Sequence, residues 1–377
     1  MSVKRNETVI QVEIEQVQEQ LSQWIKDDPR RIRIFAELIM AIPLSRSVQG
    51  NDLAENILRD VQDQSIQQML RRFYQNPAIT WEGFYLPLLQ EALRRLNLAL
   101  YELVIDTTQV GAGHRAVVLS LAYHKRSLPL VWTVEVGAKG HSKEATQVAL
   151  LKQLATHIVF PSVVVFLGDT EFDGITLQEQ LQSLGWYYVL RTSPSLYIYP
   201  EQGEGFPLGD LTPKVDCPPQ NLLNVRLTTK YCFGPVNVFA CWETPYDEPL
   251  LLTYHLPPTW PDSVRTTYER RFWTEPLFGD CKEAGFRLTE THLDQPDRLS
   301  RLFLAVSASY LWMVSVGVQA IIDQTADLVD RSKRRTLSIF KTGWRYFKRQ
   351  LKLGHLVPLH FALPTSFVLP PLKFTQT

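Results

Sequence analysis

The stretch Tyr101-Glu102-Leu103-Val104-Ile105-Asp106 decides the fold, because it is a short apolar run that ends in an aspartate. A second run, Val163-Val164-Val165-Phe166-Leu167-Gly168-Asp169, has the same design. Runs of this length, rich in β-branched residues, predict buried strands. The two together predict a sheet with an acidic side chain at the end of each of two strands, where chemistry is commonly placed.

The neighbouring sequence extends this sheet. Strands are predicted over 116–123, 130–136 and 185–190, and helices over 143–157 and 177–184. Three adjacent strands followed by helix, strand, helix and strand fit an α/β fold with an RNase H-like mixed sheet at its core. The segment 195–262 adds further strand patterns, and we expect it to be a β-rich insertion.

A third acidic residue stands in a patterned segment downstream. Tyr268, Arg271, Glu275 and Lys282 are separated by three, four and seven residues. On an α-helix they fall within an arc of about 60°, so one helical stripe carries an acid, two bases and a phenol. Pro276 follows the glutamate and predicts either a kink or the start of a new helix there.

The three carboxylates suit divalent cations. Mg²⁺ prefers hard oxygen ligands, and two such ions can activate an attacking oxygen and stabilise a leaving one. An aspartate at a strand end can equally be a turn former that bonds its own backbone. Glu171 and Asp173 compete with Asp169 as ligands, but we expect both to face solvent.

At these residues the chain resembles the bacterial DDE transposases of the insertion-sequence-four-like family. The family's glutamate helix carries a Tyr-Arg-Glu-Lys signature that this sequence matches at every gap. Asp106 lies in Ile-Asp-Thr-Thr, which is similar to the family's first-aspartate motif. Asp169 lies in a block similar to the family's Asp-Arg-Gly-Phe, although Thr170 and Glu171 replace the Arg-Gly.

The resemblance implies that Asp106, Asp169 and Glu275 are catalytic and hold two Mg²⁺ (or Mn²⁺) ions. It implies cleavage at transposon-end DNA, transfer into target DNA, and self-association in a DNA-paired complex. Tyr268, Arg271 and Lys282 would then contact phosphates. An RNase H-like nuclease without joining activity and a catalytically inactive DNA-binding relic remain as alternatives.

Two further features suit DNA. The segment from Arg331 to Lys352 has nine basic residues and no acidic one, and Trp344, Tyr346 and Phe347 are interleaved with them. We expect this segment to form a helix that lies along DNA, with Arg334 and Arg335 in contact with phosphates. The alternative is a basic helix that only faces solvent. Trp242 in the insertion is either a base-stacking residue, as the resemblance implies, or a packed aromatic.

These patterns divide the chain into five predicted parts. They are a helical N-terminal domain that is a candidate for DNA binding (1–95), the first part of the core (96–194), the insertion (195–262), the second part of the core (263–325) and a basic C-terminal helix and tail (326–377). The N-terminal helices fit either a helix-turn-helix-like module, with Arg71 and Arg72 on its recognition helix, or a bundle packed on the next domain.

Composition excludes some classes of protein. The chain of 377 residues has zero net charge and 45% hydrophobic residues, which excludes a uniformly basic DNA-coating protein and extended disorder. Its four cysteines have no zinc spacing, and we expect a cytoplasmic, nucleoid-associated protein. The uncharged stretch 302–322 is either a buried core helix, which we favour, or a membrane span.

Overall fold

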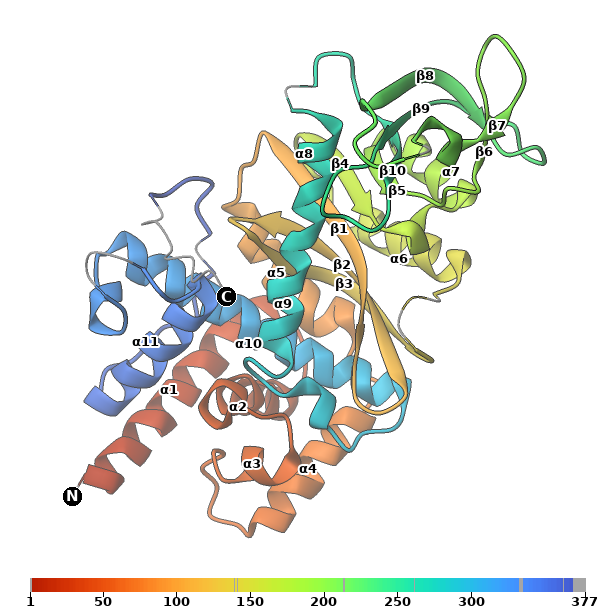
Figure 1. Cartoon of the computed structure of the whole chain (residues 1–377). Helices are drawn as coiled ribbons and strands as arrows, with labels where there is room; N and C mark the ends of the chain where they lie inside the picture. The colour runs from red at the N-terminus through yellow and green to blue at the C-terminus, as the bar shows by residue number, and fades with distance from the viewer. Residues whose placement is uncertain are drawn as a thin grey trace.

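The computed structural model shows a mixed α/β protein built on one long twisted sheet (Figure 1). It describes residues 2–138, 140, 142–212, 214–260, 262–331, 335–361 and 363–368, with side chains from Thr8 onward. A cluster of helices lies at one end of the sheet, and the strands of the insertion lie at the other (Figure 1).

The core of the sheet has the predicted strands. They are β1 (Leu100–Gln109), β2 (His114–Tyr123), β3 (Arg126–Val136), β4 (Val163–Gly168) and β5 (Tyr187–Arg191). The first three are antiparallel neighbours, and β4 pairs in parallel with both β1 and β5. The order β3-β2-β1-β4-β5 confirms the RNase H-like core.

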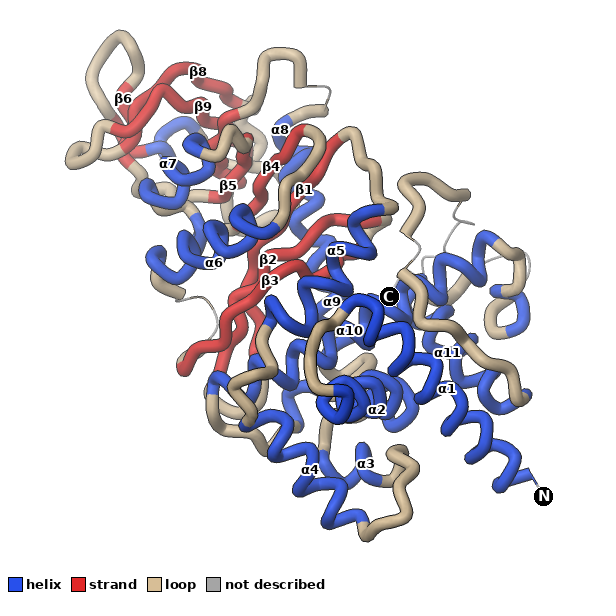
Figure 2. Tube along the Cα trace, turned by 180° about the vertical axis from the view of Figure 1, so that it is seen from behind, coloured by secondary structure: helices blue, strands red, loops and turns tan. Residues whose placement is uncertain are grey.

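The β-rich insertion is also confirmed, and it continues the same sheet. Its strands are β6 (Tyr197–Tyr199), β7 (Phe206–Pro207), β8 (Gln220–Leu227), β9 (Phe233–Cys241) and β10 (Leu250–His255). Because β10 pairs with β5 on one side and β9 on the other, all ten strands form one hydrogen-bonded sheet. Figure 2 shows this sheet running unbroken from β3 to β8.

Two helices connect the parallel strands, as expected for strands that need crossovers. The first, α6 (Glu144–His157), precedes β4, and the second, α7 (Ile175–Ser183), precedes β5. Both bury leucines against the sheet, among them Leu151, Leu154 and Leu181.

The N-terminal segment is helical, as predicted. Its elements are α1 (Ser2–Trp24), α2 (Pro29–Ser45), α3 (Gly50–Ala54), α4 (Asp63–Gln75), the π-helical turn η1 (Trp81–Tyr85) and α5 (Leu86–Arg94). Helices α2, α4 and η1 contact α10, so this segment shares the main hydrophobic core. This packing agrees with the bundle alternative, while DNA binding by the exposed Arg71 and Arg72 of α4 stays a prediction.

The long apolar helix α10 (Pro296–Ile322) is the centre of the helical cluster. It is long and apolar enough to cross a membrane, but 89% of its most apolar window is buried inside the protein, which supports the buried-helix alternative. Helix α11 (Ile339–Leu353) crosses it at Gly317 and Gly343, where the two backbones touch. A β-carbon on either glycine would collide with a carbonyl oxygen of the other helix.

The extended C-terminal segment that follows α11 packs against the helices. It buries alternate side chains at Val357, Leu359, Phe361 and Leu363. The backbone N–H of Val357 donates to the buried carboxylate of Glu13 on α1, at 2.9 Å.

Candidate active site

Asp106 and Asp169 lie on neighbouring parallel strands in matching register. The pairing of β1 with β4 ends at Val104 opposite Leu167, and two further residues along each chain bring Asp106 beside Asp169. Because alternate residues share a face of a sheet, the two carboxylates lie on the same side. Asp106 does not end its strand as predicted, since β1 continues to Gln109 by pairing with β2.

Each aspartate has one carboxylate oxygen bonded to a nearby amide. The N–H of Thr107 donates to Oδ1 of Asp106 at 2.7 Å, and the N–H of Glu171 donates to Oδ1 of Asp169 at 3.0 Å. Gly168 permits this turn, because a β-carbon there would lie 2.8 Å from Cβ of Phe172. The Oδ2 atoms of both aspartates remain for other partners.

Arg271 lies close to both Oδ2 atoms. Its Nη1 lies 3.5 Å from Oδ2 of Asp106 and 3.8 Å from Oδ2 of Asp169. The guanidinium carbon lies 4.6 Å from the centre of the Phe272 ring and 5.7 Å from that of Tyr268, which adds cation–π attraction. One cation from the patterned segment is therefore held between the two predicted metal ligands.

The pKa of Asp169 is raised above its ordinary value. Burial is the main cause, and the neighbouring charge of Asp106 adds to it. The hydrogen bond from the Glu171 amide and the charge of Arg271 act in the opposite direction. The two carboxylates thus form a site where a second negative charge is costly unless a cation is present.

The patterned segment is not the single straight helix that the spacing predicted. It consists of α8 (Val264–Glu269), a 3₁₀ turn η4 (Arg270–Trp273) and α9 (Thr274–Cys281). Pro276 is the third residue of α9, where its missing N–H removes no bond within that helix. Lys282 lies past the helix at its C-cap, so the expected stripe of four side chains is wrong.

Glu275 is exposed in the first turn of α9. The preceding Thr274 is buried, and its hydroxyl lies 3.1 Å from Oδ2 of Asp106. In the described part of the chain, no three His, Cys, Asp or Glu side chains are grouped closely enough to hold a metal ion. The convergence of all three carboxylates stays a prediction.

Residues 102–312, which include Asp106, Asp169 and Glu275, match the profile of the transposase DDE domain family. The chain belongs to this family. The fold is also similar to a solved synaptic complex of the piggyBac transposase with hairpin DNA, with a TM-score of 0.47 and 10% identity, over 92% of this chain and 77% of that one. No curated protein matches the sequence.

Several predicted DNA contacts of the transposase lie in the interior or in packed positions. Tyr268 is 2% exposed, and burial raises the pKa of its hydroxyl. Arg335 is 8% exposed, so it is not a surface phosphate contact in this arrangement, and Arg334 lies outside the described residues. Trp242 is half-buried, and its indole N–H donates to the carbonyl of Tyr246 at 3.0 Å.

In the described part of the basic segment (331 and 335–352), helix α11 begins at Ile339. Its aromatic residues pack inside, and the indole N–H of Trp344 donates to the carbonyl of Pro43 on α2 at 2.7 Å. The exposed basic side chains of α11 are Arg345, Arg349 and Lys352. These side chains are accessible to solvent, whereas that of Arg335 is buried.

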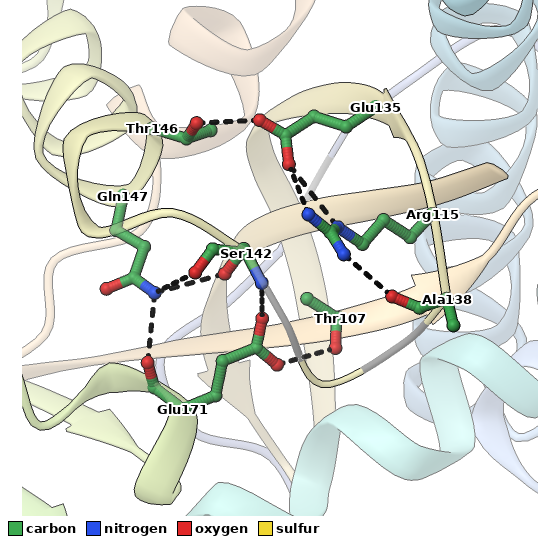
Figure 3. Close-up of polar contacts among 8 residues, drawn as sticks. All are labelled: Thr107, Arg115, Glu135, Ala138, Ser142, Thr146, Gln147 and Glu171. Atoms are coloured by element: carbon green, nitrogen blue, oxygen red, sulfur yellow. Dashed lines mark hydrogen bonds and ion pairs between the residues drawn. The ribbon is translucent and has the colours of Figure 1, made fainter.

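The expectation that Glu171 and Asp173 face solvent is wrong. Asp173 is partly buried and accepts a hydrogen bond from the hydroxyl of Thr192 at 2.7 Å. Glu171 belongs to the polar network drawn in Figure 3, and its backbone N–H also donates to Asp169.

Thr274, which contacts Asp106, was not predicted from the sequence, although its position directly before Glu275 was available as a clue.

Proposed function

We propose that Asp106, Asp169 and Glu275 are the carboxylates with which this transposase holds two Mg²⁺ or Mn²⁺ ions. The observation that carries the proposal is the matched register of Asp106 and Asp169, with the cationic side chain of Arg271 between them. Hard oxygen ligands suit these ions, and the pair already attracts a positive charge. When bound, the ions would activate the attacking oxygen and stabilise the leaving one.

Arg271 has two roles in this proposal. Its guanidinium lies between the two aspartates and offsets part of their negative charge. With metal ions bound by the aspartates, the same side chain would be available for bidentate contact with a DNA phosphate, which is a favoured pairing for arginine. Glu275 is one residue from Thr274, which touches Asp106, so rearrangement of the first turn of α9 would bring its carboxylate to the pair.

The proposed substrates are transposon-end DNA, which is cleaved, and target DNA, into which the free 3′ end is transferred. The match to the Tyr-Arg-Glu-Lys signature favours the insertion-sequence-four-like group, self-association on paired DNA ends and a cytoplasmic, nucleoid-associated setting. Exposed arginines on α11 and α4 would supply sequence-independent affinity through phosphate contacts.

The test compares cleavage and joining by the wild type and by Asp106→Asn, on DNA carrying the repeats that flank the coding region. We expect the variant to lose cleavage while its gel-shift affinity for the same DNA is nearly unchanged, because the basic surfaces remain. Asp173→Asn is the matched control, since Asp173 bonds Thr192 instead of Arg271. Wild-type cleavage without joining would indicate a nuclease, and full cleavage by Asp106→Asn would reject the proposed site.

A further inference from the structure

Glu171 links three segments of the chain (Figure 3). Its Oε2 accepts the hydroxyl hydrogen of Thr107 at 3.0 Å, and its Oε1 accepts the backbone N–H of Ser142 at 2.6 Å. Its own carbonyl accepts the side-chain amide of Gln147 at 3.0 Å. Glu171 therefore joins the turn after β4 to strand β1 and to the start of α6.

The link to β1 is made by residues that are adjacent in sequence or two residues away from the two aspartates. The backbone N–H of Glu171 holds Oδ1 of Asp169, and the backbone N–H of Thr107 holds Oδ1 of Asp106. The side chains of Glu171 and Thr107 then hold each other. The two Oδ1 atoms are thus connected through three hydrogen bonds and the covalent structure of Thr107 and Glu171, while both Oδ2 atoms lie near the cation of Arg271.

The link to α6 is anchored in turn. Gln147 donates to the Ser142 hydroxyl at 3.0 Å, so Glu171 and Gln147 both bind Ser142, two residues before this helix begins. Nearby, the Thr146 hydroxyl donates to Glu135 at 2.6 Å, and Arg115 pairs with the same carboxylate at 3.0 Å (Figure 3). The helix that covers this edge of the sheet is therefore attached to the turn carrying Asp169.

We propose that Glu171 is a positioning residue that sets the separation and orientation of Asp106 and Asp169 for the metal pair. This inference rests on the proposed function. Glu171 occupies the position at which the family block has glycine, so the bridge is a property of this chain. Both of its carboxylate oxygens already accept hydrogen bonds, which favours a role through its neighbours over direct metal coordination.

Glutamine and alanine at position 171 distinguish these roles. In Glu171→Gln, the amide oxygen can accept the Ser142 N–H, and the amide N–H can donate to the Thr107 hydroxyl, so both links are kept without the charge. Glu171→Ala removes both links. Thr107→Val removes the β1 link from its other end, and Thr107→Ser is its matched control because it keeps the hydroxyl.

The first measurement is Mn²⁺ affinity of the full chain without DNA, read from the electron paramagnetic resonance signal of free Mn²⁺. The second is cleavage of end DNA as a function of Mn²⁺ concentration. We expect Glu171→Ala and Thr107→Val to weaken Mn²⁺ binding about tenfold or more, as loss of residues that orient metal ligands commonly does. The Mn²⁺ affinities of Glu171→Gln and Thr107→Ser should stay within about threefold of the wild-type affinity.

Two outcomes would overturn the inference. If Glu171→Gln loses as much Mn²⁺ affinity as Glu171→Ala, the negative charge itself is needed, and Glu171 is a metal ligand. If Glu171→Ala and Thr107→Val, folded by circular dichroism, both bind Mn²⁺ as the wild type does, the bridge has no positioning role. Failure of the proposed function looks different, because Asp106→Asn would then bind Mn²⁺ and cleave normally.

Discussion

Replacing Arg271 with methionine tests whether its guanidinium stands in for a metal cation. The change keeps a long apolar stem against the Phe272 ring but leaves Asp106 and Asp169 facing each other. At an effective dielectric constant of about 20, the separations of 3.5 and 3.8 Å correspond to attractions of about 5 and 4 kcal/mol. Desolvation of the charges and the partial exposure of Asp169 offset much of this, so we expect a net loss of about 2–4 kcal/mol.

The assay is thermal unfolding with and without Mn²⁺. With an unfolding entropy of about 2 cal/mol/K per residue, this loss lowers the melting temperature of the 377-residue chain by about 3–5 °C. Because Mn²⁺ would supply the missing positive charge, we expect it to raise the melting temperature of Arg271→Met more than that of the wild type.

The pH dependence of the same variant has a defined sign. Asp169 already has a raised pKa, and removing Arg271 raises it further. A carboxyl with a raised pKa in the folded state contributes stability at low pH that is lost as the pH rises through that pKa. The difference in melting temperature between wild type and variant should therefore be larger at pH 7.5 than at pH 5.

Arg270→Met is the matched control, because Arg270 pairs with Glu102 and Asp262 outside the site. It should also lose stability, but Mn²⁺ should not restore it. The reasoning is refuted if Mn²⁺ shifts the wild type and Arg271→Met equally, or if Arg271→Met melts at the wild-type temperature.

Three other changes have expected outcomes. Gly343→Ala should lower the free energy of unfolding by more than about 2 kcal/mol in urea titrations, because the new methyl group meets the carbonyl of Met313. Burial raises the pKa of Glu13 to about 7, so stability falls as the pH rises through 7, and Glu13→Gln should raise the melting temperature at pH 8 but not at pH 5. Arg345→Ala with Arg349→Ala should weaken binding to end DNA and random DNA alike and flatten the salt slope by about two units, as measured by fluorescence anisotropy.

The fold was largely predictable because its core strands are strong apolar runs. The stretches ending at Asp106 and Asp169 became adjacent parallel strands, and the uncharged 302–322 segment became the buried helix α10. Long, regular patterns of this kind specify an element before tertiary contacts are known.

The details of the site depended on contacts that local sequence does not contain. The spacing of Tyr268 to Lys282 assumed one helix type, but a 3₁₀ turn separates α8 from α9 and moves Lys282 out of register. Arg335 belongs to a basic run, yet tertiary packing buries it. The Glu171 carboxylate bonds Thr107 and Ser142, which are distant along the chain. The sequence around Glu171 does not show these partners, and it therefore suggested that the side chain faces solvent.

The shared sheet limits how this protein can be shortened. A chain from which the insertion is deleted would lose β10, and the backbone groups of β5 that now pair with it would face water. An uncovered strand edge is a template for pairing with other chains, so such a truncation should aggregate instead of yielding a minimal enzyme. The insertion is thus an integral part of the catalytic domain and cannot be treated as a removable module.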